Sequence, residues 1–282
     1  MNALRIVLLL SVGLPAWGLG AERVSIVKRT AQSANFRVVA ASSEFGSDQF
    51  LQHCERLRAE LQSQWLAQND AQPWQPKCQI VVHSDRASYL RAVGQEGAQT
   101  FGSSLIQFEG ERPMTRQIDL LIDPQGELTA LSHELSHVVL ADRFRGRQPP
   151  RWLDEGIATM ADAAEKRRLH ERDCQAALRG GSALRMVDVL HLDRFTGPHQ
   201  VPAFYGQSLS LVEYLAARSA PHHVVDFAET AADRGYDRAL RQHYDIRDVA
   251  MLEREWRRHV DREPAEPAGL QSGRRASLAV AD

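Results

Sequence analysis

The chain of 282 residues has only three cysteines, Cys54, Cys78 and Cys174, and none of them form the C-x-x-C spacing of a thiolate zinc cluster. Its 34 basic and 36 acidic side chains nearly balance, and the formal net charge is -2. Such a chain lacks the basic surface that nucleic acids or anionic membranes attract, so we expect no nucleic-acid partner. It also lacks internal repeats at the periods of solenoid proteins.

Long apolar runs are also missing, except for one at the N-terminus. There, Arg5 precedes the run "IVLLLSVGLPAW", and small residues follow at positions 18–21. This order is typical of a signal peptide, so residues 1–21 are assigned to it, and export to the periplasm or secretion from a bacterium is expected. A buried helix or an uncleaved anchor is the alternative, which Pro15 and the short run oppose. No cysteine follows the run to carry a lipid, and no other segment could form a stable membrane span.

Export would place the three cysteines in an oxidising compartment. A bridge between Cys54 and Cys78 would close a short loop, but sequence alone does not set the pairing, which stays open here. Cys174 would then be left over.

The first half of the chain alternates between strand and helix patterns. Apolar residues alternate in "NFRVVAA" and "CQIVVH", which predicts strands, and recur at helical spacing in residues 48–68. Two more alternating runs, "SSLIQFEG" and "RQIDLLID", are separated by five residues and predict an antiparallel hairpin. This half therefore predicts a small mixed sheet with helices.

From Leu128 onward the apolar spacing is helical almost throughout, and one long helix is expected over residues 153–178. The whole pattern predicts an α+β fold, a sheet lobe followed by a mainly helical lobe, in a single domain over residues 22–262. The tail, residues 263–282, is rich in Pro, Gly, Ala and Ser and is predicted to be disordered.

A candidate metal site lies in the segment that begins the helical half. His133 and His137 are four positions apart, so on a helix their imidazoles share one face and can bind a single ion. Glu134 points beside that ion, where its carboxylate can take a proton from bound water. This H-E-x-x-H arrangement is typical of zinc hydrolases. Histidines on a solvated helix are the alternative, which the apolar neighbours Leu131 and Leu135 oppose.

A catalytic zinc takes three protein ligands and keeps one position open. Glu155 is the simplest third ligand, because the 18 positions from 137 to 155 allow the first helix to end and a second to begin at "RWLDEG". Two prolines in the connecting loop oppose continuation of the first helix. The sequence therefore predicts one Zn2+ ion bound by His133, His137 and Glu155.

The segments "HELSHVVL" and "PRWLDEGIA" resemble those of the gluzincin metallopeptidases. The form H-E-L-x-H followed by W-L-x-E-G-x-A is most similar to the peptidase MA-like group, which includes many exported bacterial proteins. Likeness continues in "FYGQSLSLVEYLAAR" and "LEREWRRHV", so that the resemblance covers roughly residues 103–260.

The resemblance implies a thermolysin-like architecture and a zinc-dependent peptidase that acts on a peptide or protein substrate. Glu134 would be the general base for zinc-activated water, and Tyr205 would hydrogen-bond the oxyanion. The resemblance also implies that the strand "RQIDLLID" lies at the edge of the sheet along the cleft, where a bound peptide could add as a further strand. The alternative, which the sequence leaves open, is a central strand with no free edge. Since the G-x-M-E-N motif of aminopeptidases is missing, an endopeptidase is favoured. The alternative is an envelope binding or assembly protein that keeps this fold without turnover. The oligomeric state is not predicted.

Other histidines are not expected to bind metal. His222 and His223 are adjacent, so their side chains should diverge, and His191, His199 and His243 have no partner at metal-ligand spacing.

Overall fold

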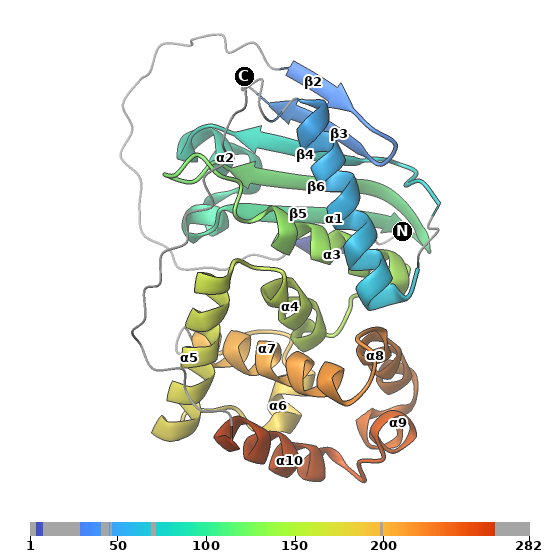
Figure 1. Cartoon of the computed structure of the whole chain (residues 1–282), viewed down its shortest axis with the longest axis vertical. Helices are drawn as coiled ribbons and strands as arrows, with labels where there is room; N and C mark the ends of the chain where they lie inside the picture. Colours follow the sequence, from blue (N-terminus) through green and yellow to red (C-terminus); the bar gives the residue numbers. More distant parts are fainter. Residues whose placement is uncertain are drawn as a thin grey trace, which may run out of the picture.

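The computed structural model describes residues 29–40, 45, 47–68, 72–197 and 200–262, and the backbone of residues 4–7. Over these residues the chain forms a mixed α/β fold, in which a sheet with helices on one face is followed by a lobe of helices (Figure 1). None of the described helices is both long and apolar enough to span a membrane. The predicted tail, and all of the predicted signal peptide except its short strand, lie outside the described residues.

A six-stranded mixed sheet forms the first lobe. Its strands are β1 (Leu4–Val7), β2 (Arg29–Gln32), β3 (Phe36–Ala40), β4 (Cys78–His83), β5 (Gly102–Glu109) and β6 (Arg112–Leu121). They lie in the order β1-β5-β6-β4-β3-β2, with β4 parallel to both β3 and β6. Strand β6, which contains most of the run "RQIDLLID", is central and pairs with β5 and β4, so it has no free edge to which a peptide could add. Val38, Ile80 and Ile118 are neighbours in this register and all are buried. Because side chains alternate between the faces of a sheet, such residues give it one apolar face.

The predicted hairpin is present, but its turn is shorter than the sequence indicates. Strand β6 already begins at Arg112, and only Gly110 and Glu111 connect it to β5. Gly110 has a φ of +60°, which glycine adopts without the steric cost of a Cβ atom. The polar residues and Pro113 look like a loop in the sequence, but cross-strand pairing extends the strand through them.

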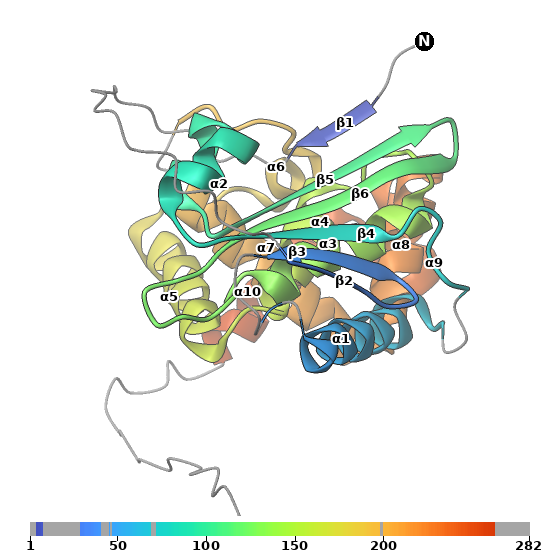
Figure 2. The ribbon, with the colours of Figure 1, turned by 90° about the horizontal axis from the view of Figure 1, so that it is seen from above.

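Strand β1 lies in the segment predicted as a signal peptide. It pairs antiparallel with β5 at the edge of the sheet, Leu4 opposite Phe108 and Val7 opposite Leu105 (Figure 2). Removal of residues 1–21 stays a prediction, and it would leave β5 as an edge strand.

Two long helices pack on the sheet face that is turned toward the helical lobe (Figure 1). The helices of this part are α1 (Asp48–Leu66), α2 (Arg86–Val93), the short 3-10 helix η1 (Gln95–Gln99) and α3 (Leu131–Phe144). Helix α1 contacts β3, and α3 contacts β5 and β6. Leu135, Val138 and Leu140 of α3 are fully buried, so this helix is part of the core rather than a solvated surface.

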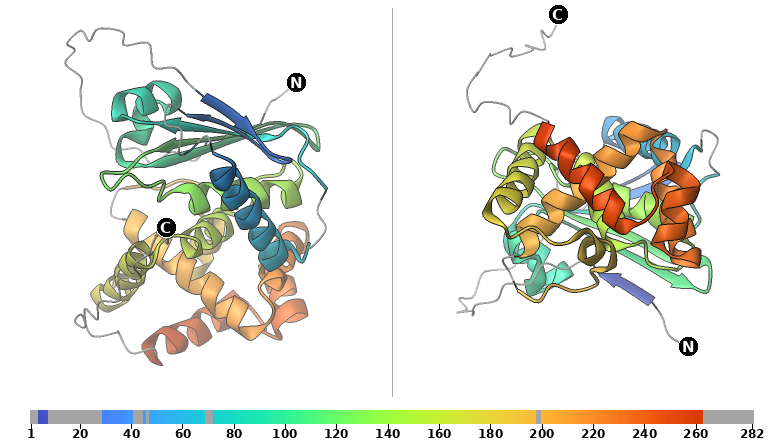
Figure 3. Two further views of the ribbon diagram at one scale, coloured as in Figure 1. Left: turned by 45° about the horizontal axis from the view of Figure 1, so that its top comes forward. Right: turned by 90° about the horizontal axis from the view of Figure 1, so that it is seen from below.

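The second lobe consists of seven described helices. They are α4 (Arg151–Met160), α5 (Ala164–Gly180), α6 (Met186–His191), α7 (Gln200–Arg218), α8 (His222–Arg234), α9 (Tyr236–Tyr244) and α10 (Val249–Arg262). Helix α7 is central and contacts α4, α5, α6, α8 and α10. Helix α10 lies on the side of α7 away from the sheet (Figure 3). The sequence pattern predicts neither α6 nor α9 as separate helices.

The single helix predicted over residues 153–178 is wrong, because the structure has two helices there. The amide of Asp162 bonds to the carbonyl of Thr159, a tight turn that ends α4, and α5 begins at Ala164. The alanine-rich sequence favours helix at this point, but tertiary contacts override such local preference. The break allows the Asp162 carboxylate to bind His133 on α3.

None of the three cysteines forms a disulfide, and all are buried. The pairing of Cys54 with Cys78 that the sequence leaves open is therefore not present in the structure. Cys54 lies on α1 and Cys78 on β4, both in the core. Burial raises the pKa of the Cys54 thiol to about 12.

Candidate metal centre

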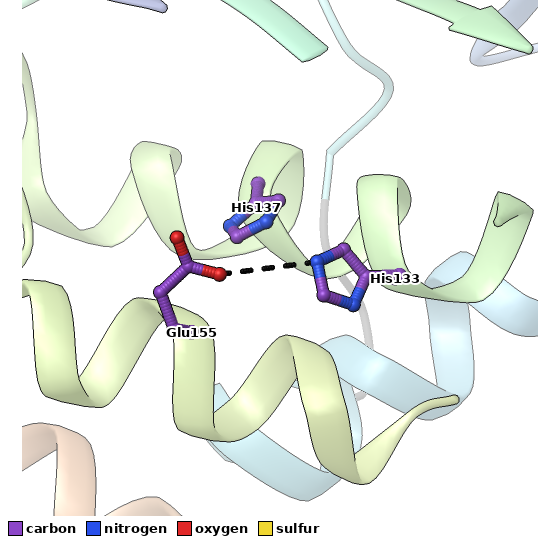
Figure 4. Close-up of side chains that lie close together, drawn as sticks. All are labelled: His133, His137 and Glu155. Carbon is purple, nitrogen blue, oxygen red and sulfur yellow. Dashed lines mark ion pairs between the residues drawn. The ribbon is translucent and has the colours of Figure 1, made fainter. Parts of the chain in front are cut away.

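Helices α3 and α4 bring together the three residues predicted as metal ligands (Figure 4). His133 and His137 lie one turn apart on α3, and Glu155 faces them from α4. One possible ligand atom from each of the three lies within 4.8 Å of the others, and His133 Nε2 is 3.9 Å from Glu155 Oε2. The three side chains could therefore hold a metal ion between them.

The chain between the two helices makes this approach possible. Arg145 and Gly146, with φ values of +47° and +82°, end α3, and α4 starts directly after Pro150.

Close packing of α4 on α7 also positions Glu155. A Cβ atom on Gly156 of α4 would lie 2.6 Å from the Ser208 carbonyl oxygen on α7. Only glycine therefore lets α4 pack this closely on α7, which fixes the position of the preceding residue, Glu155.

Both imidazoles are held by a carboxylate at Nδ1. Asp154 Oδ1 lies 2.8 Å from Nδ1 of His137, and Asp162 Oδ2 lies 3.2 Å from Nδ1 of His133. A carboxylate acceptor keeps the proton of a neutral imidazole on Nδ1, which leaves Nε2 with a free lone pair. In the neutral form of each ring, Nε2 is therefore the nitrogen that could bind a metal ion.

The charges around the site favour a bound cation. Burial by itself lowers the pKa of His137, but the carboxylates of Asp154, Glu155 and Glu134 outweigh it and raise that pKa to about 10. Burial raises the pKa of Glu155, although His137 and His133 act in the opposite direction. The negative charges of these buried carboxylates thus favour the protonated, positively charged form of His137. A divalent cation bound at the site would neutralise the same charges.

Glu134, the predicted general base, lines the same cavity as the three candidate ligands and lies against the sheet. Its side chain is buried against the first residue of β5, since a Cβ atom on Gly102 would lie 2.6 Å from Glu134 Cγ and 2.7 Å from its Oε1. The position of the Glu134 carboxylate therefore depends on the absence of a side chain at position 102.

The three candidate ligands and Glu134 line one cavity of about 560 Å3. Its other walls come from the start of β5, from α5 and from the start of α7, and they include Gly102, Arg151, Lys166, His170 and Tyr205. A concave site of this size beside a candidate metal centre can hold part of an extended ligand.

Tyr205, which the resemblance implies as an oxyanion donor, lies beside the candidate ligand Glu155. Its hydroxyl donates a hydrogen bond of 3.0 Å to Oε1 of Glu155. Burial and the charge of Glu155 raise the pKa of Tyr205 well above its usual value, so the phenol stays protonated. In this structure the Tyr205 hydroxyl group is thus hydrogen-bonded to Glu155, one of the three candidate ligands.

Four residues of the site are not found by sequence reasoning: Asp154, Asp162, Arg151 and His170. Asp154 directly precedes Glu155 in the sequence. This acidic neighbour of a predicted ligand is the one signal that could have identified Asp154 as part of the site. Asp162 and His170 give no local signal, because the unpredicted break between α4 and α5 decides where they lie.

A second group of possible ligands lies at the start of α8. The sequence predicts that His222 and His223 diverge, but their rings are 4.4 Å apart, and both lie near Asp226. Asp226 also accepts a hydrogen bond from Arg143, and His223 is exposed. This group lacks the buried, carboxylate-bound imidazoles of the first.

Comparison of the chain with models of known protein families found no match, and comparison with curated proteins found no matching sequence. Any functional conclusion therefore depends on the residues and geometry of the site itself.

Proposed function

We propose that this protein is a zinc-dependent metallopeptidase of the gluzincin type. The observation that supports it best is the set of two imidazoles and one carboxylate on α3 and α4, with a buried carboxylate at Nδ1 of each imidazole. Two histidines and one glutamate are a ligand set of catalytic zinc, which keeps its fourth position for water or substrate. The resemblance of the segments "HELSHVVL" and "PRWLDEGIA" to those of gluzincins is the second support for this proposal.

In the proposed reaction, His133, His137 and Glu155 hold the ion, which when bound lowers the pKa of a water molecule and polarises a carbonyl group. Glu134 takes a proton from the attacking water and passes it to the leaving amine. Asp154 and Asp162 keep the two imidazoles oriented. The buried surroundings of Glu134 strengthen these electrostatic interactions, because little water screens them.

We propose that the substrate is a peptide bound along β5. This strand begins at Gly102, in the wall of the cavity, and the pairing of β1 shows that its outer edge can accept an antiparallel strand. Main-chain hydrogen bonds to this edge would read the peptide backbone more than its side chains. Export with loss of residues 1–21, which is also proposed, would free the edge.

The decisive experiment measures zinc content and hydrolysis of a peptide library for the native protein and Glu134→Gln. We expect bound zinc in both and hydrolysis only in the native protein. Glu127→Gln, an exposed glutamate just before α3, is the matched control and should behave as native. Zinc without hydrolysis in the native protein, unchanged by Glu134→Gln, would support the envelope binding protein instead.

The ligand set is tested separately. His137→Ala and Glu155→Ala should both lower zinc occupancy, whereas His191→Ala and Glu171→Ala, which change exposed residues, should not. If Glu155→Ala retained zinc as well as the native protein does, Glu155 would not be the third ligand.

A further inference from the structure

The first turn of α8 carries the second group of possible metal ligands, and the function proposed above does not use it. His222, His223 and Asp226 each offer one atom, and these atoms lie within 4.8 Å of one another. None of the three residues lines the cavity beside the candidate zinc ligands. Whatever this group binds is therefore separate from the proposed peptidase site.

Helical spacing places Asp226 next to both histidines. Asp226 is four positions after His222 and three after His223, and residues three or four apart are neighbours on a helix surface. Adjacent residues of a helix point about 100° apart, which is why the sequence predicts that the two histidines diverge. Their rings nevertheless lie 4.4 Å apart, with planes at 65°. The carboxylate completes a set of ligands that the two histidines alone would not form.

The imidazoles of His222 and His223 keep their nitrogens available to a ligand. Within the part of the chain that the structure describes, no hydrogen bond or ion pair engages either ring. His243, by contrast, is joined through Nε2 to Thr230 Oγ1 at 2.9 Å. A neutral imidazole has one nitrogen with a lone pair, so each of the two rings can bind a metal ion without losing an existing contact.

Asp226 uses one of its oxygens for a contact with α3. Its Oδ1 accepts a hydrogen bond of 2.9 Å from Nη2 of Arg143, near the end of that helix. The same nitrogen lies 2.7 Å from Oε2 of Glu229, so two carboxylates share one arginine. The Asp226 side chain is 38% exposed, which allows a hydrated ion to reach it. The surplus negative charge of this group favours a bound cation.

The place of the group at the start of α8 acts against a cation, because the N-terminal end of a helix carries a partial positive charge. That effect is weak at an exposed helix end, and salt screens it. The carboxylates of Asp226 and Glu229 lie in the first turns of the same helix and act in the opposite direction. Binding then depends on coordination by the three side chains.

The donor atoms determine which ion fits. Imidazole nitrogen suits zinc, copper and nickel, whereas calcium and magnesium prefer oxygen ligands. Three protein ligands leave at least one coordination position of a zinc ion to water. Because His223 is exposed and Asp226 is shared with Arg143, we expect weaker binding here than at the buried candidate centre.

We propose that His222, His223 and Asp226 form a second metal site, which binds a divalent transition-metal ion such as Zn2+. The ion would fix the first turn of α8, a helix that packs against α1 of the sheet lobe and is joined to α3 through Arg143. The site thus lies where the helical lobe meets the sheet lobe. It does not depend on the proposed peptidase function.

Calorimetric titration of the metal-free full chain with Zn2+ tests the proposal. We expect a binding event that His222→Ala, His223→Ala and Asp226→Asn each weaken by at least about tenfold, since the loss of an outer partner of a ligand alone costs about 10- to 100-fold. Asp226→Asn keeps an oxygen that accepts from Arg143. The event should persist in His137→Ala, which removes a ligand of the candidate centre, and Mg2+ should not produce it.

The matched controls are His191→Ala and Asp233→Asn. His191 is an exposed histidine of α6, and Asp233 is a carboxylate of α8 that pairs with Arg147. Both variants should bind Zn2+ as the native protein does. Urea unfolding in the presence of a chelator should be the same for native protein and all five variants at these exposed positions, which excludes loss of folding as the cause of weaker binding.

Hydrogen exchange locates the bound ion. Zn2+ should slow exchange of the backbone amides in residues 222–230 of the native protein and of His137→Ala, because the ion restrains the first turns of α8. It should have no such effect in His222→Ala. Exchange in α10, which is remote from the group along the chain, provides the internal reference.

These outcomes separate the second site from the candidate zinc centre. If His222→Ala and Asp226→Asn bind Zn2+ with native affinity and stoichiometry, the second site is wrong, whatever the result for peptide hydrolysis. Binding that disappears completely in His137→Ala would also overturn it. A single event that is kept in His137→Ala and lost in His222→Ala would establish the second site and contradict the candidate centre.

Discussion

Nδ1 of His137 lies 2.8 Å from Oδ1 of Asp154, although 17 positions separate the two residues. Asp154 directly precedes Glu155, so one turn of α4 supplies both a candidate ligand and the carboxylate that orients another. Asp162, just beyond the same helix, does this for His133. The site therefore depends on the placement of α4 as much as on the two histidines.

We predict that Asp154→Asn lowers zinc affinity by about 10- to 100-fold, because the amide orients His137 less well and carries no charge. Competition with a fluorescent chelator measures this. Asp188→Asn is the control, since Asp188 pairs with Arg185 on the surface. Equal affinity in native protein and Asp154→Asn would contradict the role of Asp154.

Gly102→Ala should disturb Glu134 without removing zinc. The added methyl group would overlap the Glu134 side chain, and displacement of a general base by a fraction of an ångström slows hydrolysis, here by at least about tenfold. Ser104→Ala, at another buried position of β5, is the control in steady-state assays. A Gly102→Ala protein with native kcat would show that Glu134 is not constrained from this side.

Gly156→Ala should destabilise the fold. Its methyl group would press on the Ser208 carbonyl oxygen and on Val212 of α7, and such overpacking costs about 1–3 kcal/mol. In Gly180→Ala the methyl group meets no atom within 4 Å, so this helical change should be neutral or stabilise by up to about 1 kcal/mol. Urea unfolding of both variants gives the comparison, and equal effects would exclude close packing at Gly156.

The metal-free protein should lose stability as the pH rises. The pKa of His137 is about 10 in the folded chain and about 6.5 when unfolded, so folding favours its protonated form. That contribution is complete below about pH 6.5 and disappears as the pH rises through about 10.

Urea unfolding in the presence of a chelator, at several pH values between about 6.5 and 10, should show this decline in native protein. Asp154→Asn should decline less steeply, because the carboxylate that raises the pKa most is gone. Other titrating groups are common to both proteins and cancel in the comparison. Parallel declines would contradict the raised pKa of His137.

Sequence periodicity predicts the local parts of this structure well. Alternation identifies β3, β4, β5 and β6, and helical spacing identifies α1 and α3. Periodicity fails where contacts with other helices or strands decide where an element begins or ends. Pairing with β5 extends β6 through residues that look like a loop, and the contact between Asp162 and His133 accompanies the break between α4 and α5.

The sequence by itself determines that His133, Glu134 and His137 share a helix, since four residues make about one turn and the helix pattern is local. It also indicates Glu155 as their partner, through a loop of suitable length. Only the tertiary structure decides that Asp154 and Asp162 bind the two imidazoles, that Tyr205 binds Glu155, and that His170 joins the cavity. These contacts depend on how closely α4, α5 and α7 approach one another. Gly156 and Gly206 permit that approach by lacking a side chain, and no periodicity in the sequence records it.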